Sequence, residues 1–155
     1  MQFNTTTIYA LQIMLCLTQN RRIVSSSELS DTLSISQRYI INIAGRLRVG
    51  GLIVTKNGMG GGYSLLKESS QISAFDIIKL MEDGINIPDC ISEVVNIGSS
   101  LQCTLSLLID YMETYLRSMT IDRLVDKNVN DWQNEFTELV KQHINSLKLR
   151  DKAGQ

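Results

Sequence analysis

The chain has 155 residues, of which 43% are hydrophobic and 20% are charged, so it can bury a core. No apolar run approaches the ~20 residues that a membrane span needs, and residues 1–20 lack the basic start and the small-residue cleavage site of a secretion signal. One histidine, no nucleophile motif and no paired carboxylates argue against an enzyme. We expect a cytoplasmic protein without catalytic residues, membrane partner or small-molecule substrate.

Charge is divided unevenly along the chain, although the net charge is only −1. Residues 1–66 hold six basic and two acidic side chains, a balance of +4, whereas residues 67–155 hold nine basic and fourteen acidic, a balance of −5. Such asymmetry indicates that the N-terminal half meets a polyanion and that the C-terminal half does not.

Two helices are predicted at the start of the chain. Residues 5–19 place Ile8, Leu11, Leu15 and Thr18 at helical spacing, and Cys16 is expected to be a small core residue. A short second helix over residues 28–33 follows, with its N-cap at Ser26 or Ser27. Residues 34–36 break the pattern.

A third helix is predicted over residues 37–49, ended by Gly50 and Gly51. Its apolar stripe has the spacing i, i+3, i+4, i+7 and consists of Ile40, Ile43, Ala44 and Leu47. The opposite face carries a mixture of basic, polar and apolar residues with one glycine: Arg38, Ile41, Asn42, Gly45 and Arg48.

A glycine-rich stretch at residues 58–62 follows the third helix. It is not a nucleotide-binding loop, because no Lys-Ser or Lys-Thr pair follows Gly62 and Tyr63 stands where the third glycine of the dinucleotide fingerprint belongs. Residues 52–55 are apolar and β-branched, and residues 63–65 alternate, so the stretch is typical of a β-hairpin with a glycine tip.

Helix, short helix, tight turn, helix and hairpin is the order of a winged helix-turn-helix domain, a mainly α fold with a small β-hairpin. In such a domain the third helix enters the major groove of double-stranded DNA, and the hairpin is a wing over residues 53–66. The residues predicted to bind DNA are Ser36, Gln37, Arg38, Tyr39, Ile41, Asn42, Arg46, Arg48, Lys56, Asn57, Gly60 and Gly61.

The C-terminal half predicts further helices and a dimer. An amphipathic helix begins after the candidate N-cap Ser73, residues 85–100 have no clear period, and an amphipathic helix covers residues 131–149. A broad apolar stripe, wider than one neighbour needs, indicates a partner subunit and consists of Leu101, Leu105, Leu108, Met112, Tyr115 and Met119. We expect a DNA-binding domain at 1–66, a linker helix, sensor loop and dimerisation helix at 67–127, and a C-terminal extension at 128–155.

The stretches "YIINIAGRLRVGGLIV" and "NGMGGGYSL" resemble the Rrf-two family of bacterial winged-helix repressors, and the resemblance covers about residues 1–125. It implies a homodimeric repressor that reads a near-palindromic operator, because two-fold related helices contact two half-sites. Asn57 stands where the family usually has a wing arginine that reaches into the minor groove, so either Lys56 substitutes for that arginine or the wing grips less tightly.

The same resemblance bears on Cys90 and Cys103, which match the first and last of three cluster-binding cysteines in some relatives, while the middle one is missing. Three alternatives follow: an iron–sulfur cluster held by these two thiolates with Asp89 or Glu93, a thiol switch without a cofactor, or regulation that is blind to redox state. We expect no bound metal or cofactor. An adaptor of the same fold that has lost DNA binding is the alternative function.

Overall fold

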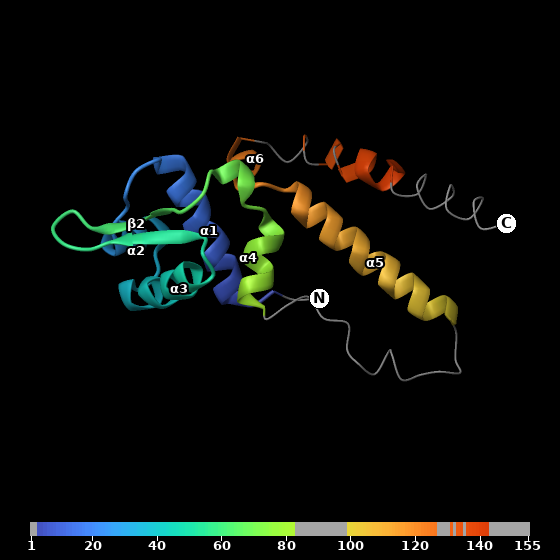
Figure 1. Ribbon diagram of the computed structural model, residues 1–155, viewed down its shortest axis with the longest axis horizontal. Coiled ribbons are helices and arrows are strands. Elements are labelled where there is room, and N and C mark those ends of the chain that lie inside the picture. Colours follow the sequence, from blue (N-terminus) through green and yellow to red (C-terminus); the bar gives the residue numbers. More distant parts are fainter. Residues whose placement is uncertain (1–2, 83–98, 127–130, 132, 135, 143–155) are drawn as a thin grey trace. The chain divides into compact units, whose positions relative to one another are not determined.

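The computed structural model describes residues 3–82, 99–126, 131, 133–134 and 136–142, and for residues 99–103 it describes the backbone alone (Figure 1). The chain divides into two compact units, one made of residues 1–87 and 116–125 and the other of residues 88–115 and 126–155. The proposed domain boundaries at 66 and 127 stay a prediction.

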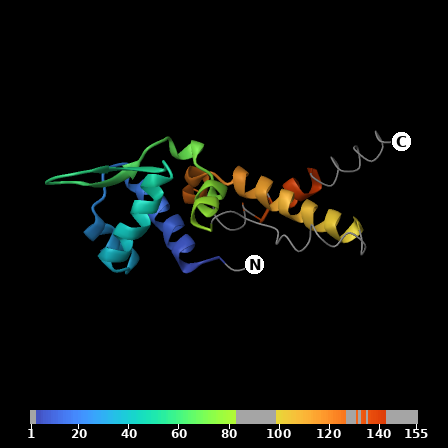
Figure 2. The ribbon, with the colours of Figure 1, turned by 60° about the horizontal axis from the view of Figure 1, so that its bottom comes forward.

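The order of elements confirms a mostly helical fold with a two-stranded hairpin, which projects past the neighbouring helices as a wing (Figures 1 and 2). The described elements are α1 (Thr5–Asn20), α2 (Ser26–Leu33), α3 (Gln37–Val49), β1 (Ile53–Lys56), β2 (Gly62–Leu65), the 3₁₀ turn η1 (Ser69–Gln71), α4 (Ala74–Met81), α5 (Ser99–Ser118) and α6 (Ile121–Asp126). Residues 131, 133–134 and 136–142 are also helical.

Serine caps fix the starts of three helices. Ser36 caps α3 by accepting a hydrogen bond from the Tyr39 amide, and Ser73 forms a capping box with Asp76, as its sequence position predicted. The expected cap of α2 at Ser26 or Ser27 was wrong. Ser25 is the cap, because the β-bridge of the preceding residue to the hairpin holds the chain extended up to that point.

Helix α1 is the centre of the first unit and confirms the predicted helix. Of the residues whose spacing predicted it, Ile8 is 41% exposed and Leu11 and Leu15 are partly buried against the core, whereas Ile13 and Met14 are completely buried. The reason is that α1 packs against α2, α3, α4 and β2, so a much wider face than one stripe is covered. The buried residues of α1 are Thr7, Ala10, Ile13, Met14, Cys16 and Leu17, which confirms Cys16 as a core residue.

The wing is attached to the helices through its second strand. The hairpin pairs Ile53 with Leu65 in antiparallel register, and Tyr63 forms a further bridge to Val24 with hydrogen bonds of 2.8 and 2.9 Å. At Gly62 the backbones approach so closely that an added Cβ would lie 2.3 Å from the Val24 carbonyl oxygen. Glycine at this position therefore lets the wing lie against the chain between α1 and α2.

Helix α4 is fastened at both ends. The Ala74 amide donates to the Met119 carbonyl at 2.8 Å, and the Ile121 amide donates to the Ile72 carbonyl at 2.9 Å. At the other end, the Glu82 carboxylate accepts hydrogen bonds from the Asn4 backbone amide and side chain and from the Thr7 hydroxyl of α1. The segment that follows α5 and the start of α1 thus contact opposite ends of α4.

In the second unit, the rings of Tyr111 and Tyr115 on α5 pack edge-on against Phe136, with centroids 5.9 and 5.0 Å apart. Leu108 remains 52% exposed and Phe136 42% exposed. In the single chain these two apolar side chains are therefore exposed to solvent.

We predict that Gly62→Ala weakens the attachment of the wing, because its Cβ would collide with the Val24 carbonyl oxygen. The expected loss of unfolding free energy is about 1–3 kcal/mol, measured by thermal or urea denaturation. Gly45→Ala is the matched control, since a Cβ there meets no atom within 4 Å and alanine favours a helix. Equal stability of the two variants would contradict the close approach.

We predict a pH-dependent contribution from Glu82. The hydrogen bonds from the Thr7 hydroxyl, and then from the Asn4 amide, hold the pKa of its carboxyl below the usual value of 4.5. Because the folded-state pKa is lowered, the stabilisation is present above the unfolded pKa and is lost as the pH falls through the folded pKa. Glu82→Gln should lower Tm at pH 7 by about 2–4 °C, a partly screened effect, and the difference in Tm should shrink as the pH falls through the folded pKa.

Candidate nucleic-acid interface

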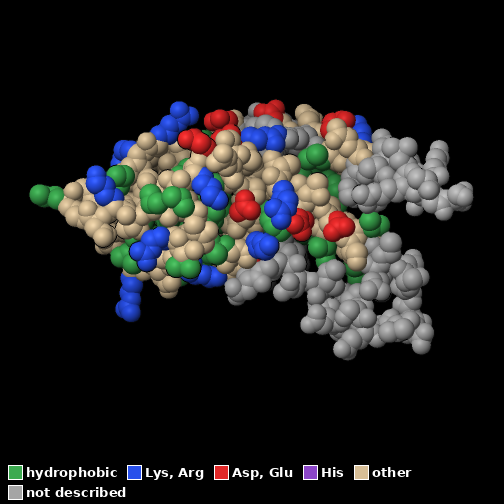
Figure 3. Space-filling model, viewed as in Figure 1, with side chains coloured by type: hydrophobic (Ala, Val, Ile, Leu, Met, Phe, Trp, Pro, Cys, Tyr) green, Lys and Arg blue, Asp and Glu red, His purple; other side chains and the backbone are tan. Residues whose placement is uncertain are grey.

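Helix α3 presents a mixed polar face opposite its buried stripe. The predicted stripe of Ile40, Ile43, Ala44 and Leu47 is at most 1% exposed, which confirms that face as core. On the outer side, Ile41 is 50% exposed, and Arg38, Asn42 and Arg48 are also exposed. On the view of Figure 3, Lys and Arg side chains predominate on the part of the surface nearest the wing.

Gly45 leaves the middle of this outer face without a side chain. A Cβ added there would meet no atom within 4 Å, so packing does not require glycine at this position. The result is a shallow hollow along α3, lined by Ile41, Asn42, Gly45, Arg46, Arg48, Val49 and Leu80. At Gly45 itself, a base-pair edge could approach the helix backbone more closely than it could past a side chain.

The start of α3 is tied to α2. The Gln37 side chain donates a 2.8 Å hydrogen bond to the Ser26 hydroxyl, while the Ser36 hydroxyl accepts from the Tyr39 amide at 3.4 Å. Both side chains are exposed but already have partners within the chain. Their contacts hold the turn between the two helices, the feature that sets the angle of a recognition helix.

Two side chains that the sequence assigned to DNA point instead into the protein. The hydroxyls of Tyr39 and Thr6 share a hydrogen bond of 2.6 Å, and the Tyr39 ring packs edge-on against Tyr9. Arg46 Nη2 donates to the carbonyls of Leu80 and Met81 in α4. Residues 39 and 46 lie four and three positions from the buried Ile43, so they adjoin the core stripe, and this spacing could have revealed their inward direction.

The wing tip is a tight turn that exposes side chains and backbone. The Gly61 amide donates to the Gly58 carbonyl at 2.9 Å, and Gly60 has φ of 77°. Gly61 was predicted to bind DNA, but its amide is hydrogen-bonded inside the turn. Lys56 and Asn57 are exposed at the end of β1, and Met59 is completely exposed at the tip.

The predicted sensor and dimer residues are only partly within the described chain. Cys90 lies outside the described residues, and Cys103 lies in α5 with its side chain not described. Within the part of the chain that is described, no cluster of His, Cys, Asp and Glu could hold a metal ion. Of the dimer stripe, Leu101 has no described side chain, Leu108 is exposed, and four are half-buried: Leu105, Met112, Tyr115 and Met119.

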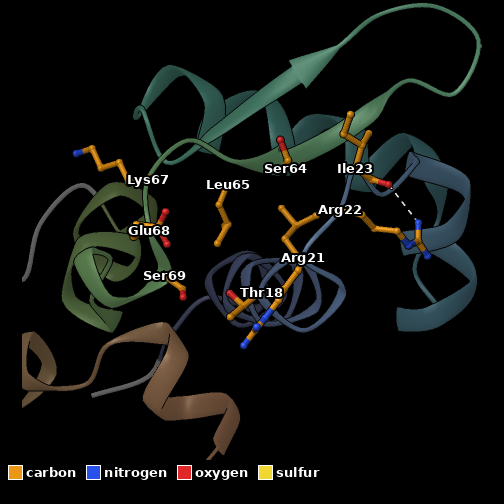
Figure 4. A pocket seen from close by; sticks show the side chains of 10 residues that line it. Thr18, Arg21, Arg22, Ile23, Ser64, Leu65, Lys67, Glu68 and Ser69 are labelled. Carbon is orange, nitrogen blue, oxygen red and sulfur yellow. Dashed lines mark hydrogen bonds between the residues drawn. The ribbon is translucent and has the colours of Figure 1, made fainter.

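A second hollow, with a volume of about 540 Å³, lies between the end of α1, the chain that follows it and β2 (Figure 4). Its charged lining residues are Arg21, Arg22, Lys67 and Glu68. Arg22 is bound to Glu28 through both terminal nitrogens and also donates to the Ile23 carbonyl, and the Thr18 hydroxyl donates to the chain within α1. Thr18 and Arg22 are thus bonded within the chain, and we assign this hollow no ligand.

Comparison with known proteins identifies the domain. The Rrf2 family model, described as an iron-dependent transcriptional regulator, matches residues 3–127. The transcriptional regulator IscR of Pectobacterium atrosepticum is 29% identical over 121 residues, which are 74% of this chain and 74% of IscR. No helix in the described ranges has the length and apolar character to cross a membrane.

Solved structures agree with this assignment. CymR, the global cysteine regulator of B. subtilis, is 28% identical with a TM-score of 0.70, covering 81% of this chain and 96% of CymR. CymR of Staphylococcus aureus is 27% identical with a TM-score of 0.66, covering 81% and 98%. The resemblance of the recognition helix and wing motifs is thereby confirmed, and the chain belongs to the Rrf2 family of DNA-binding transcriptional regulators, which are not enzymes.

Proposed function

We propose that the protein is a cytoplasmic, homodimeric transcriptional repressor that reads a near-palindromic operator with α3 and the wing. The observation that carries the proposal is the outer face of α3, where Arg38, Ile41 and Asn42 are exposed directly opposite a fully buried stripe. A serine-capped helix that follows α2 after a short turn can enter the major groove with this face.

Three exposed side chains of α3 suit different bases. The Arg38 guanidinium can donate two hydrogen bonds to a guanine, the Asn42 amide can pair with an adenine, and Ile41 can touch a thymine methyl group. On the wing, Lys56 and Asn57 are available to phosphates or to the minor groove. Arg48 lies on the exposed side of α3 and suits a phosphate.

The dimer is inferred from α5. Leu108 is half exposed in the single chain, and its stripe neighbours are only half buried, so a partner subunit would remove further apolar surface from water. Two copies related by a two-fold axis would place two α3 helices on half-sites about one turn of DNA apart. A single domain binds too weakly to select one site in a genome.

We predict that Arg38→Ala and Asn42→Ala each lower the affinity for the operator by about 1–3 kcal/mol while leaving the fold intact. Both side chains are exposed and neither belongs to the core. Fluorescence anisotropy with operator and scrambled duplexes measures the loss, and circular dichroism checks the fold. Lys67→Ala, which removes an exposed charge away from α3, is the control; unchanged binding by both test variants would refute the assignment.

We predict that Leu108→Asp and Met112→Asp split the dimer, because an unpaired charge would enter the apolar contact. Thr114→Asp is the matched control, since Thr114 is an exposed residue on the same helix and outside the stripe. Sedimentation velocity at micromolar concentration distinguishes monomer from dimer. A monomeric wild type, or equal dissociation by the control, would contradict the proposed interface.

A further inference from the structure

Outside its apolar stripe, the recognition helix contacts the C-terminal end of α4 through Arg46. Arg46 Nη2 donates to the Leu80 carbonyl at 3.2 Å and to the Met81 carbonyl at 3.1 Å. The last carbonyls of a helix have no intrahelical donor and carry the negative end of the helix dipole. A guanidinium is therefore well suited to cap α4 from the neighbouring helix.

Packing reinforces these hydrogen bonds one turn further along. A Cβ added to Gly50, directly after α3, would lie 2.3 Å from Leu80 Cδ2. The Leu80 side chain thus lies against the end of α3, in the space that a Cβ on residue 50 would enter. Through Arg46 and Gly50, α3 is held to α4 at two points on the same side.

The charge of Arg46 is also balanced inside the protein. The Glu82 carboxylate follows α4 directly, and the positive charge of Arg46 contributes to the lowered pKa of Glu82, after the hydrogen bonds from Thr7 and Asn4. Arg46 is half-buried, whereas Arg38 and Arg48 on the same helix are exposed. Three arginines of one helix therefore lie in two different environments.

The opposite end of α4 is held by the chain that leaves α5. The Arg117 guanidinium lies 3.9 Å from the centroid of the Phe75 ring, and the Ala74 amide is bonded to the Met119 carbonyl. Helix α4 consequently contacts both the segment after the proposed dimer helix and the recognition helix.

We propose that Arg46 is a positioning residue for DNA recognition: it fixes the orientation of α3 against α4 through the Leu80 and Met81 carbonyls and does not itself contact DNA. This inference rests on the proposed function. It follows that Arg46 contributes to operator affinity through the geometry of α3, so its effect should be independent of salt concentration.

Salt dependence separates this role from a phosphate contact. Each phosphate contact releases condensed counterions and adds about 0.9 to the slope of log affinity against log salt concentration. Arg46→Ala should lower operator affinity at least about tenfold with the wild-type slope, whereas the matched Arg48→Ala should reduce the slope by about 0.9. Binding is measured by anisotropy at several salt concentrations, at a temperature where circular dichroism shows every variant folded.

Two further variants guard against loss of folding. Leu80→Ala loosens the same contact from α4, which does not contact DNA in the proposal, and should lower affinity with an unchanged slope. Arg46→Lys retains a donor for one carbonyl and should restore part of the affinity that alanine loses. A structural role without influence on recognition would lower Tm in Arg46→Ala and leave the affinity of the folded protein unchanged.

The outcomes are distinct. A slope reduced by about 0.9 in Arg46→Ala, or full affinity in that variant, would overturn the positioning role while leaving the proposed function intact. A wild-type protein that binds no duplex selected from random DNA at low salt would refute the proposed function, and the positioning role with it.

Discussion

The structure of the first unit depends on the burial of α1. Ile13 and Met14 are completely buried because α2, α3, α4 and β2 all pack around this one helix. With its inner stripe committed to that core, α3 has only one face left for solvent, and that face carries Arg38, Ile41 and Asn42. The burial of the inner stripe therefore determines which side chains of α3 face the solvent.

Backbone contacts give the wing and α4 their places around this core. Gly62 permits the bridge between Tyr63 and Val24, and the carbonyls at the end of α4 accept hydrogen bonds from Arg46. Both contacts satisfy polar backbone groups that would otherwise lose free energy on burial. They also join the wing and α3 to elements distant in the sequence, so a change at the C-terminal end of α4 can alter the orientation of the exposed face of α3.

The sequence predicted local features better than contacts between elements. The stripe of α3 and the capping box at Ser73 follow from short-range spacing, and both are present. Spacing did not identify the buried residues of α1. Four neighbouring elements surround this helix, so its buried surface is much wider than a single apolar stripe. Arg46 was assigned to DNA because of its charge; its carbonyl partners lie more than thirty residues away and have no side-chain signature.

In the proposed complex, the exposed face of α3 reads the major groove while Arg46 stays bonded to α4. A crystal structure of the protein bound to its selected operator tests both parts at once. We expect Arg38 and Asn42 at base edges, two copies of the chain on two half-sites, and Arg46 still at the Leu80 and Met81 carbonyls. A complex in which α3 lies outside the groove, or in which Arg46 has left α4 for a phosphate, would contradict the account.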